Sequence, residues 1–224
     1  MPRLQFRRWL PSGPAQRLLR KTDGSAILEF AISLPLLVVF VVGIYDFSGA
    51  FNQKQKIEQA AQEGAIIAAA QPTNDLYGNT NPPSLQPVVA AVFNSLAGSG
   101  VLAQANTVPC SMNPPPIPST TSQPGLTVGP LTWVYTISGC SGYPQDSNRG
   151  CMIDNGNNLW IVINRAWTPT VTPGSTAAVP VGTSVMVAYD YHWRFNSAIQ
   201  LLFPDARYKP KTCISETSTV LNQS

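Results

Sequence analysis

The sequence predicts an α+β protein, in which a long N-terminal helix precedes a domain with a second helix and an antiparallel sheet. Two observations support this fold class. Helix-compatible sequence, apolar at its start, runs from about residue 25 to residue 70, and no proline interrupts it between Pro35 and Pro72. Further along the chain, segments rich in β-branched and aromatic residues indicate strands. The chain of 224 residues has room for one domain of ordinary size plus appendages.

The apolar run at residues 25–45 is long enough to cross a membrane. Its 21 residues carry one charge, that of Glu29. As a helix they would extend about 31 Å, close to the thickness of the hydrocarbon core of a bilayer. A secretory signal peptide has a shorter apolar region followed by a small-residue cleavage site, and neither feature is present. We therefore expect a retained, single-pass membrane helix.

Charge is distributed unevenly along the chain. Six of the 14 basic residues precede Gly24, against one of the 11 acidic residues. Basic residues that flank an apolar run stay on the cytoplasmic side, so everything after Tyr45 is expected outside the cytoplasm. The remaining chain holds eight basic and ten acidic residues. A domain without excess positive charge is not expected to bind nucleic acid.

Glu29 is an unusual residue for its position near the start of the apolar run. A lone carboxylate in hydrocarbon is costly, which makes an intramembrane acid a candidate functional residue. The alternative is that Glu29 marks the edge of the membrane and reaches the aqueous interface. Asp46, at the other end of the run, is expected to be an ordinary interfacial residue.

The stretch "GSAILEFAISLPLL", which begins at Gly24, resembles the processing site of type IV pilin-like proteins of the tight-adherence (Tad/Flp) class. The longer stretch to Ala70 is similar to the N-terminal module of TadE/TadG-like minor pseudopilins. The shared features are Glu29-Phe30, Pro35, Gly43, the "YDF" motif and "AAQEGAIIAAA". The chain departs from these relatives at Ile66, where they usually carry arginine.

This resemblance implies a processed membrane protein. A membrane aspartic prepilin peptidase would cut between Gly24 and Ser25, and Glu29, next to Phe30, would become the fifth residue and act in assembly. Residues 1–24 would be a basic leader, 25–70 the long helix and 71–224 an extracytoplasmic domain. The expected partners are the peptidase, other Tad pilins or pseudopilins, and inner-membrane assembly proteins. The expected location is the bacterial inner membrane with a periplasmic domain, or an extracellular pilus after assembly.

The domain after the long helix is expected to contain one more helix and several strands. Apolar residues at helical spacing predict the helix, and the glycines of "GSG" (98–100) end it; these residues are Leu85, Val88, Val89, Val92, Phe93 and Leu96. Strands are expected at 131–138, 159–167, 184–195 and from Cys213 onward. We also expect a hairpin turn at Asn155-Gly156 and a short apolar helix at 197–204.

The cysteines are expected to form disulfides, because four of them lie on the outer side of the membrane: Cys110, Cys140, Cys151 and Cys213. Their spacing fits no zinc pattern. Cys140 and Cys151 flank a short loop, which favours that pair and leaves Cys110 for Cys213.

No enzymatic activity, cofactor or metal is expected. His192 is the only histidine, and a strand histidine is the simplest interpretation of it. The Asp154–Asn158 cluster lacks the spacing of a calcium loop and is expected to be a turn. Besides the pseudopilin reading, the sequence allows a membrane-anchored extracytoplasmic binding or adhesin domain outside a pilus. Cleavage after Gly24 would distinguish a pseudopilin from a membrane-anchored domain, because an anchor has no reason to be cut there.

Overall fold

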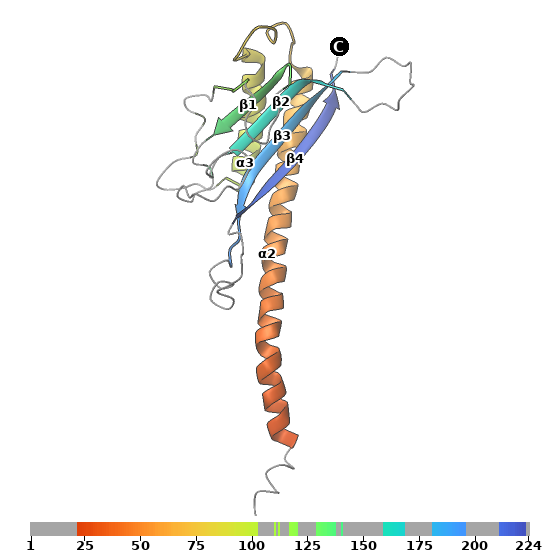
Figure 1. Ribbon diagram of the computed structural model, residues 1–224. Helices are drawn as coiled ribbons and strands as arrows, with labels where there is room; N and C mark the ends of the chain where they lie inside the picture. Colours follow the sequence, from red (N-terminus) through yellow and green to blue (C-terminus); the bar gives the residue numbers. More distant parts are fainter. Residues whose placement is uncertain are drawn as a thin grey trace, which may run out of the picture. The chain divides into compact units, whose positions relative to one another are not determined.

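The computed structural model describes residues 22–102, 110, 112, 117–120, 129–137, 140, 159–168, 181–195 and 211–222. In these residues the chain forms α2 (Thr22–Ala70), η1 (Pro83–Leu85), α3 (Gln86–Gly98) and four strands. The strands are β1 (Thr132–Ile137), β2 (Leu159–Trp167), β3 (Gly182–His192) and β4 (Lys211–Leu221) (Figure 1). The predicted α+β class is confirmed.

Helix α2 is continuous over 49 residues and includes Pro35 without ending there. The chain nevertheless divides within this helix into two compact units, Met1–Tyr45 and Asp46–Ser224. The boundary coincides with the end of the predicted membrane span. The folded domain therefore begins at Asp46, inside the helix, and contains the second half of α2.

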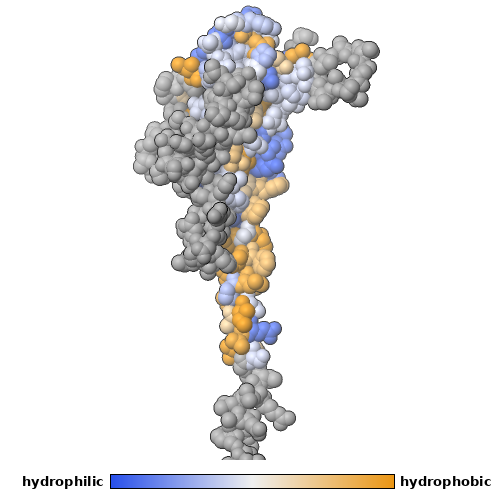
Figure 2. Space-filling model, in the orientation of Figure 1, coloured by the Kyte–Doolittle hydropathy of each residue, from blue (hydrophilic) through white to orange (hydrophobic). Residues whose placement is uncertain are grey.

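In the first unit, the side chains of α2 are uncovered by protein. Large apolar residues such as Ile27, Phe40 and Ile44 are each more than 60 % exposed, and apolar side chains dominate the surface of this segment (Figure 2). Within the described residues, α2 is the one helix that is long and apolar enough to cross a membrane. Such a surface is stable in hydrocarbon but unfavourable in water.

The strands form one antiparallel sheet in the order β1-β2-β3-β4. Each of the four predicted strand segments overlaps one of these strands, although β3 and β4 begin two residues before the predicted starts at 184 and 213. Odd-numbered residues such as Tyr135, Ile161 and Val187 point to the main core. Even-numbered residues such as Val134, Val162 and Ala188 form a smaller cluster on the opposite face. This alternation is the period of two that a pleated strand imposes.

The core lies between the sheet and the two helices, which cover the same face (Figure 1). The second half of α2 contributes mainly small side chains, among them Ala61, Ala65 and Ala68, all fully buried. At Gly64 the backbone approaches its neighbours most closely: a Cβ there would lie 2.5 Å from Val92 Cγ2 of α3 and 3.3 Å from Val185 Cγ1 of β3. Small residues on this face let the helix pack closely on both elements.

Helix α3 ends as the "GSG" sequence predicts. Gly100 has a positive φ of 70°, a conformation that glycine adopts without strain. The N–H of Gly100 bonds the carbonyl of Ala97, and the N–H of Val101 bonds that of Leu96, which is the Schellman arrangement. Lys56 of α2 donates to the carbonyl of Ser99 at 2.8 Å, so a cation also neutralises this helix end.

Three sequence predictions lie outside the described residues. They are the hairpin turn at Asn155-Gly156, the polar cluster at Asp154–Asn158 and the short helix at 197–204.

Candidate functional site

The residues of the predicted processing and assembly site all lie in the first turns of α2. Gly24 and Ser25 are already helical, and Glu29 and Phe30 follow one turn later. The side chains of Ser25, Glu29 and Phe30 are exposed, that of Phe30 by 65 %. Ser25 and Glu29 are four residues apart, so they occupy the same face of the helix.

The carboxylate of Glu29 makes no hydrogen bond or ion pair with any described residue. The one contact at this residue is to its backbone, where Ser33 Oγ donates to the Glu29 carbonyl at 2.8 Å. This hydrogen bond lies within the helix and does not involve the carboxylate, which can therefore bind another group. A carboxylate that is uncovered on an apolar helix needs a cation from elsewhere if it is to sit in lipid.

Asp46 is the buried anchor that joins α2 to the sheet domain. Its side chain is 3 % exposed. One carboxylate oxygen accepts the backbone N–H of Arg194 at 3.2 Å, and the other accepts the N–H of Phe195 at 3.3 Å. Tyr191 donates its hydroxyl to the Asp46 carbonyl at 3.4 Å. Both oxygens of the carboxylate thus accept a hydrogen bond from the turn that follows β3.

The expectation that Asp46 is an ordinary interfacial residue is therefore wrong. The acid is buried because the chain immediately after β3 supplies two N–H donors, and these come from residues 148 and 149 positions away. Gly49, one turn further along α2, makes room for this contact: a Cβ there would lie 2.9 Å from the Tyr191 hydroxyl. In the sequence, the acid between two aromatic residues in "YDF" is the only local sign of this site.

The second half of α2 carries a stripe of apolar and small residues at three- and four-residue steps, and most of this stripe packs in the core. Ile57, Ala61 and Ala68 are fully buried, and Gly64 lies in the same interface. Phe47, by contrast, is 72 % exposed. Lys54 interrupts the stripe with a charge, and its Nζ lies 3.2 Å from Glu216 Oε1 of β4.

A polar group is buried at the far end of α2. Arg165 of β2 is 2 % exposed and donates to the carbonyl of Gln71 at 2.8 Å. Asp75 accepts the backbone N–H of Ser84 at 2.9 Å. Burial raises the pKa of Asp75, but the hydrogen bonds from Ser84 and the attraction of Arg165 outweigh that effect and leave the pKa below its usual value. Burial raises the pKa of Tyr135, and the nearby Asp75 adds to this.

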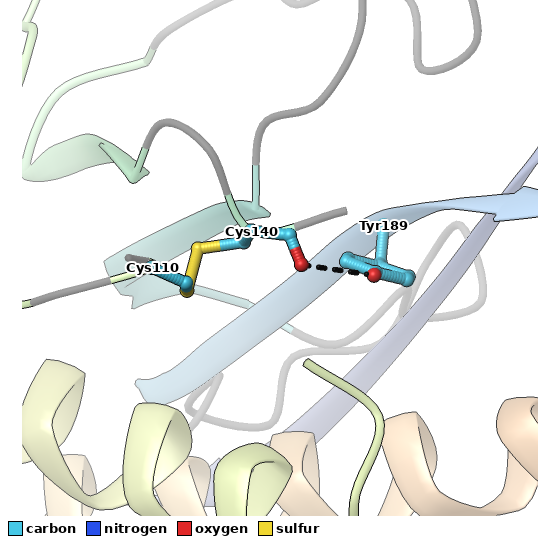
Figure 3. Close-up of a disulfide and its surroundings, with 3 residues drawn as sticks. All are labelled: Cys110, Cys140 and Tyr189. Carbon is cyan, nitrogen blue, oxygen red and sulfur yellow. Dashed lines mark hydrogen bonds between the residues drawn. A yellow bond between two sulfur atoms is a disulfide. The ribbon is translucent and has the colours of Figure 1, made fainter. Parts of the chain in front are cut away.

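The disulfide in the described residues joins Cys110 to Cys140, with a Cα–Cα distance of 4.5 Å. It lies beside β3, where Tyr189 donates its hydroxyl to the Cys140 carbonyl at 3.1 Å (Figure 3). Cys140 is fully buried. Cys213 is also disulfide-bonded, and Cys151 lies outside the described residues.

The predicted pairs Cys140–Cys151 and Cys110–Cys213 are therefore wrong. The prediction chose the shortest loop, but a disulfide also needs Cα atoms within about 7 Å of each other. The fold meets that requirement by bringing Cys110 to Cys140, which follows β1, at a sequence separation of 30.

His192 is the last residue of β3 and is partly buried. Across the described part of the chain, no group of three or more His, Cys, Asp or Glu side chains gathers in a way that would hold a metal ion. Asp190, two residues earlier on the strand, is buried.

Comparison with known families gives a match at the helix that carries the predicted processing and assembly residues. Residues 24–65 match the family of TadE-like proteins. The match begins at Gly24 and ends just past Gly64. It therefore includes the apolar half of α2, whose side chains are exposed, and most of the half that packs on the sheet. No curated protein and no solved structure matches the chain.

Proposed function

Because the chain is TadE-like over residues 24–65, we propose that it is a minor pseudopilin that takes part in assembling a Tad/Flp-type adhesive pilus. The observation that carries this proposal is the position of the family match. It starts at Gly24, where a basic leader meets an apolar helix, and it continues through a helix half whose apolar side chains are uncovered. A subunit that inserts first in a membrane and then among other helices needs such a surface.

In this proposal the apolar half of α2 spans the bacterial inner membrane once. The N-terminus is cytoplasmic, because six basic residues precede Gly24, and the sheet domain is periplasmic. A disulfide in that domain is compatible with an oxidising compartment. The partners are a prepilin peptidase, other pilins or pseudopilins and the inner-membrane assembly proteins. The protein is structural and not an enzyme, in keeping with its family.

The exposure of Glu29 supports a role in assembly. After cleavage, Ser25 carries an α-amine that is largely protonated near neutral pH. It lies one helical turn from Glu29 in its own chain, and the amine of a neighbouring subunit can approach the same uncovered carboxylate from outside. Pairing with a cation removes most of the penalty for a carboxylate in lipid. Glu29 would therefore set the axial register when the helix docks on its neighbours.

Processing is tested by the mass of the mature N-terminus in membrane fractions. The expected start is Ser25. Gly24→Leu should leave the uncut precursor in the membrane, whereas Gly43→Leu, a matched change further along the same helix, should be cut normally. A mature protein that still starts at Met1 or Pro2 would contradict processing and favour a membrane-anchored binding domain.

Assembly is tested by Glu29→Gln, which keeps the size and removes the charge, and by Glu29→Ala. Both variants should be inserted and cleaved but should fail in piliation and in crosslinking to neighbouring subunits. Ser33→Ala is the control, because it changes an exposed residue one turn away that hydrogen-bonds to the Glu29 backbone. If Glu29→Ala supports normal piliation in cells that depend on this protein, the register role is wrong.

A further inference from the structure

Three aromatic side chains, two exposed and one partly buried, form a group just beyond the apolar run. Phe47 and Phe51 lie one turn apart on α2 and are 72 % and 62 % exposed. Trp193 follows the end of β3, and its ring lies 5.7 Å from that of Phe47. We call these three residues the aromatic cluster. None of them belongs to the two hydrophobic clusters that the described residues form.

The Trp193 ring is held in a defined orientation. Its Nε1 donates to Thr212 Oγ1 of β4 at 3.0 Å, and its ring packs edge-on against Tyr191 at 5.2 Å. The cluster therefore combines two phenylalanines on the helix with a tryptophan that the sheet fixes beside them. The cluster is therefore an ordered part of the surface of the folded domain, and its residues are not isolated from one another.

The position of the cluster along α2 corresponds to a membrane–water interface. If residues 25–45 cross the hydrocarbon core, Phe47 lies about 3 Å and Phe51 about 9 Å past its edge, at about 1.5 Å per residue. The headgroup layer is about 5–8 Å thick on each side of a bilayer. Helical side chains lean toward the N-terminus of their helix, so the Phe51 ring lies closer to this layer than its backbone position does. Tryptophan and other aromatic rings are favoured in this layer, because it accommodates an apolar ring and a polar N–H together.

The helix presents no exposed charge to lipid between Glu29 and the cluster. Asp46 is the one charged residue between Glu29 and Lys54, and the N–H groups of Arg194 and Phe195 bury its carboxylate. Lys54, the next charge, pairs with Glu216 beyond the cluster. No exposed charge therefore lies on the helix between Glu29 and Phe51, which favours a lipid surface as the occupant.

We propose that Phe47, Phe51 and Trp193 bind the headgroup layer of the bilayer and hold this end of the sheet domain at the membrane surface. The inference rests on the membrane anchoring in the proposed function but not on cleavage or pilus assembly. In it, the end of β3 touches lipid, whereas Trp167, which pairs with Gly182 at the opposite end of β3, stays in water.

Quenching by brominated lipids tests this contact directly. The full chain is reconstituted in phosphatidylcholine–phosphatidylglycerol vesicles whose acyl chains carry bromine near the glycerol end. Trp193→Phe keeps an apolar ring and should remove more than half of the quenchable tryptophan fluorescence. Trp167→Phe, the matched control, should leave the quenched amplitude unchanged. If quenching is the same with and without Trp193, the proposal is overturned.

The helix side of the cluster is tested with Phe47→Ser/Phe51→Ser. Both side chains are exposed, so far-UV circular dichroism and thermal unfolding should be unchanged, while the quenching of Trp193 should fall by more than half. Ile66→Ser is the control, since Ile66 is also exposed, by 61 %, but lies about 31 Å past Tyr45 along the helix. Unchanged quenching in the double variant would overturn the proposal.

Measuring insertion of the chain in vesicles together with the quenching distinguishes a failure of this inference from a failure of the proposed function. If the chain inserts in vesicles and Trp193 is not quenched, the membrane contact is wrong and the pilus role is untouched. If the chain is not cleaved or does not support piliation but Trp193 is quenched, the membrane contact holds. A chain that alkaline carbonate extracts completely from vesicles would overturn both.

Discussion

The carboxylate of Asp46 accepts the backbone N–H of Arg194 at 3.2 Å, across 148 positions of sequence. This contact, with that of Phe195, joins the helix to the turn after β3 at the first residue of the folded domain. The buried acid follows the apolar run without presenting an exposed charge there. The same residue therefore serves the packing of the domain and the continuity of the apolar surface.

Removing the Asp46 carboxylate should destabilise the sheet domain. Asp46→Ala removes the carboxylate that accepts the N–H groups of Arg194 and Phe195, and we expect a loss of about 1–3 kcal/mol in the free energy of unfolding. Asp46→Asn keeps one acceptor and should lose less. Urea unfolding in detergent measures both, with the exposed Glu63→Ala as the control. Equal stabilities of Asp46→Ala and Glu63→Ala would show that the contact contributes nothing.

Adding one methyl group at Gly64 should also destabilise the domain. The new Cβ would meet Val92 Cγ2 at 2.5 Å and Val185 Cγ1 at 3.3 Å, so α3 or β3 must shift. Overpacking of this kind costs about 1–3 kcal/mol. Gly98→Ala is the matched control, because nothing lies within 4 Å of a Cβ at that position. Thermal unfolding that ranks Gly64→Ala at or above the wild type would contradict the packing.

The Cys110–Cys140 disulfide should appear in peptide maps of the non-reduced protein. Its sequence separation of 30 corresponds to a stabilisation of about 3–4 kcal/mol in the chain-entropy account. The double variant Cys110→Ser/Cys140→Ser should lose most of that, measured by urea unfolding. A crosslinked peptide that joins Cys140 to Cys151 would contradict the pairing.

Asp75 should make the domain less stable in acid. Its pKa in the folded protein lies below the usual value, so its contribution is complete above the pKa of the unfolded chain. That contribution is lost as the pH falls through the folded pKa. Asp75→Asn keeps an acceptor for the Ser84 N–H but removes the charge near Arg165. The variant should therefore lose less stability than the wild type between neutral pH and about pH 2. Parallel curves of stability against pH for the two proteins would contradict this.

Sequence patterns alone predicted the secondary structure well. The alternation in the four strand segments and the spacing of Val88, Val92 and Leu96 follow from contacts within one face of one element. The end of α3 follows from the conformational freedom of Gly100. The match to TadE-like proteins likewise depends on one continuous segment, residues 24–65. These features are local, so the order of residues is sufficient to reveal them.

Contacts between distant segments were decided by the tertiary structure. The sequence determined that Asp46, Phe47 and the cysteines lie outside the apolar run, but not what each one touches. The burial of Asp46 depends on Arg194 and Phe195, and the exposure of Phe47 depends on where the sheet ends against α2. Loop length favoured Cys151 as the partner of Cys140, whereas the fold brings Cys110 there. Hydrogen bonds and disulfides act over a few ångströms in space, and only the folded chain determines which residues come that close.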